Sequence, residues 1–270
     1  MSVVICAFNE ADHIGRLLSS LADQTRPPIE VIVVDDGSTD ETARITESHG
    51  ALALRVTHRG PARGRNLGAR VASGDILVFL DGDMACTPRF VELLVRPIIA
   101  GATGSFTREI YVGNQSNRWA RAYSIMRGLD GGRLLPPSFP DVWDNFRAIR
   151  RDAFLSVGGN DDVGYGEDRT AARKLGEPAV VAPGAECLHF NPSSLHEIFT
   201  NGRWIGRGTQ IRRIRPPWRD HRPHRVLRWM LRDIRAGMPI AVAVAARVAY
   251  HVGVSAGLID SWLRPGRHWK

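Results

Sequence analysis

The stretch Asp75-Ile76-Leu77-Val78-Phe79-Leu80-Asp81-Gly82-Asp83 decides the fold class of this 270-residue chain. Its apolar run follows the turn Ser73-Gly74, which predicts a buried strand with two carboxylates at its carboxyl end. Open α/β sheets bind their ligands at that end of the strands. Alternate residues of a strand point the same way, so Asp81 and Asp83 can converge. Paired oxygen ligands suit Mg or Mn, although Asp-Gly-Asp is also ordinary turn chemistry.

Strand and helix patterns alternate around this stretch. Ser2–Phe8 and Ile29–Val34 predict buried strands, separated by a helix over Glu10–Gln24. A helix over Ala62–Ala72 leads into the strand that ends at Asp81. The alternation predicts an α/β fold with a mainly parallel sheet flanked by helices. Beyond residue 100 the regular alternation of strands and helices changes, and we expect a further strand over Gly104–Val112.

The net charge of +8 is concentrated near the C-terminus. Residues 203–235 hold eleven arginines against two aspartates. Such a block suits the phosphates of a nucleotide, a nucleic acid or an anionic lipid, or it is a solvated surface. Ala236–Ile259 follows, an apolar stretch interrupted by Arg247 and His251. A central arginine costs about 2.5–3.5 kcal/mol on membrane insertion, so we expect helices on a membrane or on the domain rather than a span.

The cysteines and the N-terminus indicate a reducing compartment. Cys6, Cys86 and Cys187 form neither a metal-ligand spacing nor an even disulfide set. Met1 leads directly into the first strand without a charged segment followed by an apolar one. We therefore expect a cytoplasmic protein.

Two further acidic motifs carry candidate chemistry. The string Asp35-Asp36-Gly37-Ser38-Thr39-Asp40-Glu41-Thr42 ends the second strand, where a carboxylate can bind a base or ribose hydroxyls. The string Gly164-Tyr165-Gly166-Glu167-Asp168-Arg169 places an acidic pair at a helix start, after glycines that permit close approach of a substrate. A capping turn is the alternative interpretation of either string, although Asp35–Thr42 is more specific than a cap requires.

Four ordered motifs resemble the family-2 glycosyltransferases. They are Val3-Val4-Ile5-Cys6-Ala7-Phe8-Asn9-Glu10, Asp35–Thr42, Gly60-Pro61-Ala62-Arg63-Gly64-Arg65-Asn66-Leu67-Gly68 and Asp81-Gly82-Asp83. The resemblance is strong over residues 2–100 and looser to about residue 210. It implies the GT-A fold, a nucleotide-sugar donor and inversion at the anomeric carbon. It also implies a nucleotide-sugar-binding half (1–100) and an acceptor and catalytic half (101–210) of the same domain. The basic and apolar residues beyond them predict a helical extension (211–270) that can associate with a membrane.

The resemblance assigns roles to individual residues. Those implied to contact the nucleotide-sugar are Cys6, Phe8 and Asp36 at the base pocket, Asn9 and Glu10 at its edge, and Arg65 and Asp81 near the nucleotide. Cys6 replaces the proline or threonine common in the family. Arg203 and Arg207 are candidate diphosphate ligands, although Thr200-Asn201-Gly202-Arg203-Trp204 lacks the glutamine of the processive members' Gln-x-x-Arg-Trp motif.

The same resemblance implies a metal site and a general base. Asp83 is the expected direct ligand of Mn or Mg, with Asp81 and His189 as further candidates. Asp168 is the expected base for the acceptor hydroxyl, and Glu167 is the alternative.

The expected function is transfer of a sugar from a nucleotide diphosphate sugar, by family habit a UDP-sugar, to a hydroxyl acceptor. We expect a glycan or lipid-linked acceptor in cell-envelope or polysaccharide synthesis, at the inner face of the cell membrane, with no nucleic-acid partner. Two alternative functions account for fewer of these sequence features. A nucleotidyltransferase needs a phosphate-binding glycine loop that Ala7-Phe8-Asn9-Glu10-Ala11 lacks. A non-catalytic polyanion- or lipid-binding protein leaves the acidic motifs unexplained.

Overall fold

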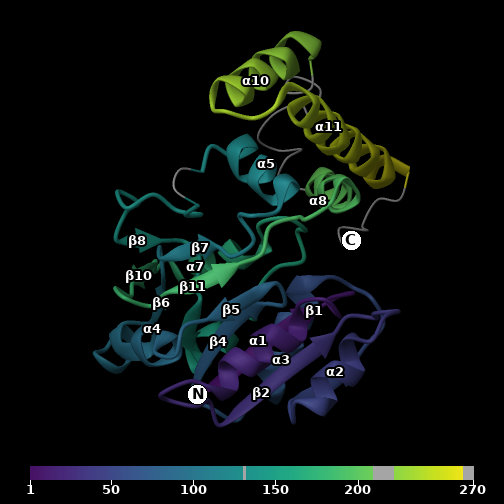
Figure 1. Ribbon diagram of the computed structural model, residues 1–270. Coiled ribbons are helices and arrows are strands. Elements are labelled where there is room, and N and C mark those ends of the chain that lie inside the picture. Colours follow the sequence, from purple (N-terminus) through teal and green to yellow (C-terminus); the bar gives the residue numbers. More distant parts are fainter. Residues whose placement is uncertain (130–131, 209–221, 264–270) are drawn as a thin grey trace. The chain divides into compact units, whose positions relative to one another are not determined.

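The computed structural model describes residues 1–129, 132–208 and 222–263 (Figure 1). The chain forms two compact units. Unit 1 contains Met1–Tyr111, Leu134–Asp162 and Glu167–His189, and unit 2 contains Val112–Arg133, Val163–Gly166 and Phe190–Lys270. These divisions differ from the expected boundaries at residues 100 and 210, because the segment 101–210 contributes to both units. Part of the expected extension, with Arg212, Arg213, Arg215 and Arg219, lies outside the described residues.

Unit 1 begins with the predicted strand and helix alternation. Its first elements are β1 (Ser2–Ala7), α1 (Ile14–Ala22), β2 (Glu30–Asp35), α2 (Thr42–Ser48), β3 (Leu52–Arg55), α3 (Pro61–Val71) and β4 (Ile76–Asp81). These strands pair in parallel in the order β3-β2-β1-β4. The carboxyl ends of β1, β2 and β4 therefore meet at one edge of the sheet, and the α/β fold class is confirmed.

The same sheet continues with strands from later in the chain. They are β9 (Ala148–Arg150), β6 (Gly104–Phe106), β10 (Ala179–Val181) and β8 (Val142–Trp143), in that order after β4. β9 runs antiparallel to both β4 and β6. The accompanying helices are α4 (Phe90–Ile99), α6 (Arg151–Ser156), the 3-10 turn η1 (Glu167–Arg169) and α7 (Thr170–Leu175).

A second, three-stranded sheet has the order β5-β11-β7. Its strands are β5 (Met84–Cys86), β11 (Cys187–His189) and β7 (Ile110–Val112). The single strand expected over Gly104–Val112 is therefore wrong, because β6 and β7 belong to different sheets. Between them the Thr107 hydroxyl accepts a hydrogen bond from the Glu109 amide and donates one to the Ala185 carbonyl, which turns the chain.

The core of unit 1 lies on both faces of the large sheet. Successive residues of β1 point to opposite faces. Val3 and Ile5 pack in the cluster that contains the apolar side of α1, and Val4 packs in the cluster on the other face. A Cβ at Gly68 would lie 2.4 Å from a methyl group of Val4, so α3 approaches the sheet closely.

Four helices of unit 2 lie together in Figure 1: α5 (Arg118–Met126), α8 (Leu195–Arg207), α10 (Pro223–Arg235) and α11 (Ile240–Leu263). Glycines spaced four residues apart bring α8 and α11 into backbone contact, a spacing that permits close helix approach. They are Gly202 and Gly206 on α8, and Gly253 and Gly257 on α11. A Cβ at Gly253 would lie 2.2 Å from the Phe199 carbonyl oxygen.

We expect Gly253→Ala to lower the free energy of unfolding by about 1–3 kcal/mol, the usual cost of overpacking. The added methyl group meets a backbone oxygen, so the helices must separate. Ser255→Ala, at an exposed position of the same helix, is the matched control. Thermal denaturation measures both variants, and equal melting temperatures for wild type and Gly253→Ala would disprove the close crossing.

The two faces of α11 differ sharply in chemistry. Its charged residues point into unit 2: Arg247 is only 5% exposed and pairs with Asp233 of α10, and Asp260 pairs with Arg203 and Arg207 of α8. The large exposed side chains of α11 are all apolar and follow one side of the helix, namely Ile240, Val244, Val248, Val252, Ile259, Trp262 and Leu263. At about 1.5 Å per residue this 24-residue helix is about 36 Å long.

Candidate active site

The loops that follow β1 and β2 are tied together at the carboxyl edge of the sheet. Asn9 adopts a left-handed backbone conformation (φ 56°), which asparagine tolerates better than most residues. Its amide donates to the Ser38 hydroxyl (2.9 Å), and its side-chain oxygen accepts from the Thr39 amide (2.9 Å). A Cβ at Gly82 would lie 2.9 Å from Glu10 Cγ, so Glu10 lies against the Asp81-Gly82-Asp83 turn.

Asp36 is buried, and its carboxylate is held by the loop before α3. Oδ1 accepts from the Arg59 amide (2.8 Å), and Oδ2 accepts from the Gly60 amide (2.7 Å). His58 Nδ1 lies 2.9 Å from Oδ2, and the His58 ring stacks on Phe8 with centroids 4.1 Å apart. Asp36 thus positions the loop that carries His58, a residue the sequence motifs did not single out.

Cys6 forms an apolar wall between β1 and α3. A Cβ at Gly64 would lie 2.3 Å from Cys6 Sγ, so only glycine lets the helix come this close. Burial raises the pKa of the Cys6 thiol to about 12. The thiol therefore stays protonated at neutral pH and is not a nucleophile here.

Asp81 is clamped between two arginines. Arg65 Nη2 lies 2.6 Å from Oδ1, and Arg147 Nη1 lies 2.8 Å from Oδ2. Burial opposes ionisation of this carboxyl, but the charges of Arg147 and Arg65 outweigh it and hold its pKa well below the usual range. Arg65 also pairs with Glu167, so it links the turn after β4 to the acidic pair of η1.

Arg147 was missed by the sequence reasoning, and topology explains its position. β9 runs antiparallel to β4, with Val78 opposite Ala148. Residues just before β9 therefore lie beside the carboxyl end of β4, where Asp81 is. Asn145 and Arg147 are two residues apart on an extended segment, the spacing that places side chains on one side. The alternation of polar residues at Asn145 and Arg147 was the one signal in the sequence. It did not reveal that β9 pairs with β4.

Asp83 and His189 form a second cluster at this edge. β5 pairs with β11 so that His189 lies opposite Met84, next to Asp83. His189 Nε2 is 3.4 Å from Asp83 Oδ2. Asp83 Oδ1 and His189 Nδ1 are buried without a hydrogen-bond partner among the described residues. Asp83 Oδ1 can therefore serve as a ligand, with His189 Nε2 beside the same carboxylate, whereas the two oxygens of Asp81 are engaged by arginines.

These residues fit a divalent ion that a substrate helps to hold. The described part of the chain contains no cluster of three or more candidate side-chain ligands. Mg and related ions are commonly bound through one or two carboxylates together with substrate phosphates. Asp83, with His189 beside it, would hold such an ion, and diphosphate oxygens would complete its coordination.

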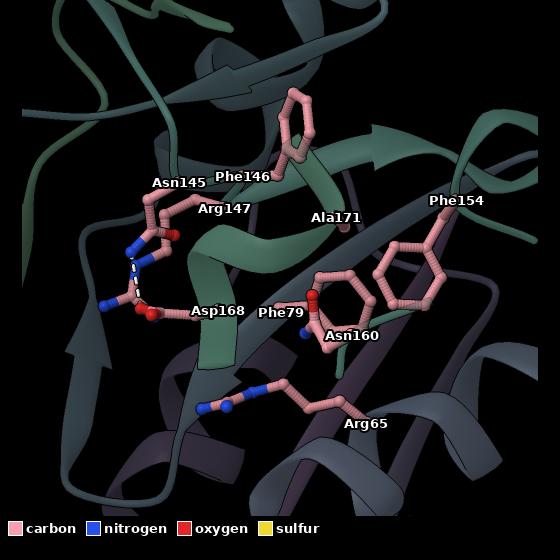
Figure 2. Close-up of a pocket in the computed structure, with 9 residues that line it drawn as sticks. All are labelled: Arg65, Phe79, Asn145, Phe146, Arg147, Phe154, Asn160, Asp168 and Ala171. Atoms are coloured by element: carbon pink, nitrogen blue, oxygen red, sulfur yellow. Dashed lines mark hydrogen bonds between the residues drawn. The ribbon is translucent and has the colours of Figure 1, made fainter. Parts of the chain in front are cut away.

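The acidic pair of η1 divides into a buried and an accessible carboxylate. Glu167 is 3% exposed, pairs with Arg65, and leaves Oε2 without a partner among the described residues. Asp168 Oδ2 accepts from the Asn145 side-chain amide at 2.5 Å. Figure 2 shows Asp168 and Asn145 facing each other in a pocket that Arg65 and Arg147 also line.

α3 positions the loop that leads toward this pocket. The Asn66 side chain donates to the Asn160 carbonyl oxygen (2.8 Å) and accepts from the Asn160 amide (2.8 Å). Gly159 has a left-handed backbone (φ 72°), and a Cβ there would lie 2.3 Å from the Asn66 side-chain oxygen. Arg65 and Asn66 thus fix both the carboxylate cluster and its neighbouring loop.

Arg203 and Arg207 have a different environment from the one expected. Arg203 Nε and Arg207 Nη2 each lie 2.6 Å from Asp260 Oδ2. Both guanidiniums therefore attach α8 to α11 within unit 2. This pairing gives them a structural role, and we do not assign them to the diphosphate.

Comparison with known proteins identifies the family. A model described as glycosyl transferase family 2 matches residues 2–158, more than half of the chain. The chain belongs to glycosyl transferase family 2. The family 2 region covers β1–β4 and β9, and therefore includes Asp36, Arg65, Asp81, Asp83 and Arg147.

Among curated relatives, the family 2 chain is 26% identical over 175 residues to a glucosyl-dolichyl phosphate glucuronosyltransferase of Haloferax volcanii. That match covers 60% of this chain and 56% of the relative. It is also 38% identical over 96 residues to glycosyltransferase AglE of the same organism, covering 33% and 31%. The chain thus spans about half or less of these relatives.

The fold agrees with solved structures. Staphylococcus aureus TarS in complex with UDP-GlcNAc matches with a TM-score of 0.56 at 18% identity, covering 97% of this chain and 91% of that one. At this identity the likeness establishes the GT-A fold alone. The α/β core is the architecture shared with that protein.

Proposed function

We propose that this family 2 glycosyl transferase moves a sugar from a UDP-sugar to a hydroxyl acceptor, inverting the anomeric centre. The observation that carries the proposal is the accessible Asp168 carboxylate, in a pocket that also contains the arginines clamping Asp81. Family membership supports a nucleotide-sugar donor. The UDP-GlcNAc complex of TarS supports uridine as the base.

In the proposed reaction the acceptor hydroxyl oxygen attacks the anomeric carbon in line with the departing diphosphate. A new carbon–oxygen bond forms as the bond from that carbon to the phosphate oxygen breaks. The electron pair leaves with the nucleoside diphosphate, and Asp168 takes the hydroxyl proton. Asn145 holds the Asp168 carboxylate in place. Burial and ion pairing make Glu167 the weaker candidate for this role.

Asp83 and His189 are the proposed protein ligands of Mn or Mg in this reaction. Such an ion, when bound, supplies positive charge that offsets the charge developing on the leaving diphosphate. The partnerless Oδ1 of Asp83 and the position of His189 Nε2, 3.4 Å from Asp83 Oδ2, support this assignment. Arg65 and Arg147 contribute fixed positive charge at the same edge through their contacts with Asp81.

We further propose that the protein works at the cytoplasmic face of the cell membrane, on a glycan or lipid-linked acceptor. Among the helices of the described residues, α11 is the one that is long and apolar enough to cross a membrane. Its inward pairs with α8 and α10 favour a helix lying on the surface instead. The apolar outer face of α11 and the exposed arginines of α10, such as Arg228 and Arg235, suit an anionic interface.

A thermal-shift panel tests the donor assignment. We expect UDP-sugars with Mn to raise the melting temperature, because ligand at 100 times its Kd adds about 2.7 kcal/mol to stability. GDP- and TDP-sugars test the base, and the same sugar as its 1-phosphate controls for the sugar alone. A folded protein that no nucleotide-sugar stabilises, and that transfers or hydrolyses none of them, would refute the proposed activity.

A further inference from the structure

Unit 2 contains a cavity of about 270 Å³ that the proposed sugar transfer does not use. Three helices contribute to it: α5 and the residue that follows it, α10, and α11. The side chains that give it its chemistry are three arginines (Arg127, Arg232, Arg247) and three aromatic residues (Tyr123, Trp229, Tyr250). A cavity with guanidinium groups and aromatic rings suits an anion attached to an apolar body.

The charges around the cavity do not balance. Asp233 is fully buried and binds Arg247 Nε (2.6 Å) and Arg232 Nη2 (3.0 Å). Arg127 lies over the ring of Tyr123 at 5.9 Å and pairs with no carboxylate among the described residues. Three guanidiniums thus share one carboxylate, which leaves two positive charges uncompensated by ion pairs within the described chain.

The arginines are also held in place before any ligand arrives. The Met126 carbonyl oxygen accepts from Arg232 (2.8 Å) and from Arg247 (3.3 Å). The Arg247 guanidinium lies 5.6 Å from the centre of the Trp229 ring. Groups fixed in this way lose little freedom on binding. Arg232 is half exposed and Arg127 is exposed, so the cavity is open to solvent on their side.

We propose that this cavity binds the phosphate of an anionic lipid headgroup, an inference that rests on the membrane contact proposed above. A guanidinium fork matches two oxygens of a phosphate. The helices that supply Trp229, Arg232 and Arg247 also expose Leu227 and Leu231 on α10 and Val244 and Val248 on α11. Those side chains have the chemistry to enter the acyl region beside a bound headgroup, which a soluble phosphate does not require.

Vesicle flotation with the full chain tests the proposal. We compare vesicles of phosphatidylcholine alone with vesicles that also contain phosphatidic acid, and expect the wild type to prefer the latter. Arg127→Gln should weaken binding to the phosphatidic acid vesicles about tenfold, because it removes a charge-assisted hydrogen bond to phosphate. Arg127 has no ion pair within the described chain, so this variant is expected to fold.

Arg228→Gln is the matched control, since Arg228 is exposed on α10 and does not line the cavity. It should weaken binding by about fivefold or less at low salt, the contribution of one surface charge near an anionic membrane. At 0.5 M salt we expect its effect to vanish through screening, whereas the effect of Arg127→Gln persists. If the two variants lose vesicle binding equally at both salt concentrations, Arg127 acts only as one more surface charge, and the proposal is overturned.

A second experiment, with soluble ligands, distinguishes the phosphate of a lipid from inorganic phosphate. Short-chain dihexanoyl phosphatidic acid should raise the melting temperature of the wild type but not of Arg127→Gln. Inorganic phosphate giving an equal shift at equal concentration would identify a soluble anion and overturn the lipid assignment. UDP-sugar stabilisation of Arg127→Gln should match that of the wild type. A wild type that binds UDP-sugar but neither vesicles nor the short-chain lipid would refute this inference and leave the proposed sugar transfer standing.

Discussion

Asp168→Asn is expected to lower the rate of sugar transfer by about 10²–10⁴-fold, the usual contribution of a general base. The amide cannot take the acceptor proton, but it keeps the shape of the carboxylate. Donor binding should be unchanged, so UDP-sugar should stabilise the variant as it does the wild type. Initial rates at saturating donor and acceptor, together with a thermal-shift titration, measure the two effects separately.

Asp161→Asn is the matched control, because it also changes an aspartate to asparagine near the pocket. Asp161 pairs with Lys174 and is about half exposed. Asp161→Asn should therefore lower the rate of sugar transfer by less than Asp168→Asn does. Exposed pairs of this kind are worth little, about 0.2–1 kcal/mol. Full turnover in Asp168→Asn, with Glu167 intact, would show that Asp168 is not the general base and that another group has this role.

Asp83→Ala is expected to abolish the stabilising effect of Mn on the UDP-sugar complex and to reduce transfer to background. The variant removes the proposed metal ligand but no ion pair with an arginine, so its own melting temperature should stay close to that of the wild type. Thermal shift with and without Mn, and binding of Mn followed by its paramagnetic resonance signal, give readouts that do not depend on turnover.

Asp81→Asn should behave differently, because it removes the partner of Arg65 and Arg147. Breaking a buried pair costs about 3–5 kcal/mol, and partial exposure of Asp81 places this variant at the lower end of that range. Retained Mn stabilisation in Asp83→Ala would contradict the assignment of Asp83, whatever happens to Asp81→Asn.

The sequence was sufficient to predict the alternation of strands and helices in the first half of the molecule and the carboxyl edge where the carboxylates lie. Apolar runs at Ser2–Ala7, Glu30–Asp35 and Ile76–Asp81 each end in loop residues with polar side chains. Parallel strands bring their carboxyl ends to one edge, so the placement of Asp36 and Asp83 at that edge followed from the pattern, whereas Asn9 was placed there by the family resemblance. The family assignment from these motifs is confirmed.

Partners contributed by distant segments were not readable from the sequence. His58 stacks on Phe8 because the loop before α3 folds over β1, and no periodicity signals that contact. Likewise, Arg203 looked like a free phosphate ligand until Asp260, on another helix, proved to be its partner. Side-chain pairing depends on which elements become neighbours, and local pattern does not record that.

By itself, therefore, the sequence determined that this chain forms an α/β sheet with acidic residues at the carboxyl edge of its parallel strands, because strand period and apolar content are local properties. Only the tertiary structure decided the state of each carboxylate. The antiparallel course of β9 brings Arg147 to Asp81, and the pairing of β5 with β11 brings His189 to Asp83. One aspartate is consequently neutralised by arginines and the other is left with an unpartnered oxygen, since charge pairing is set by contacts between segments far apart in the chain.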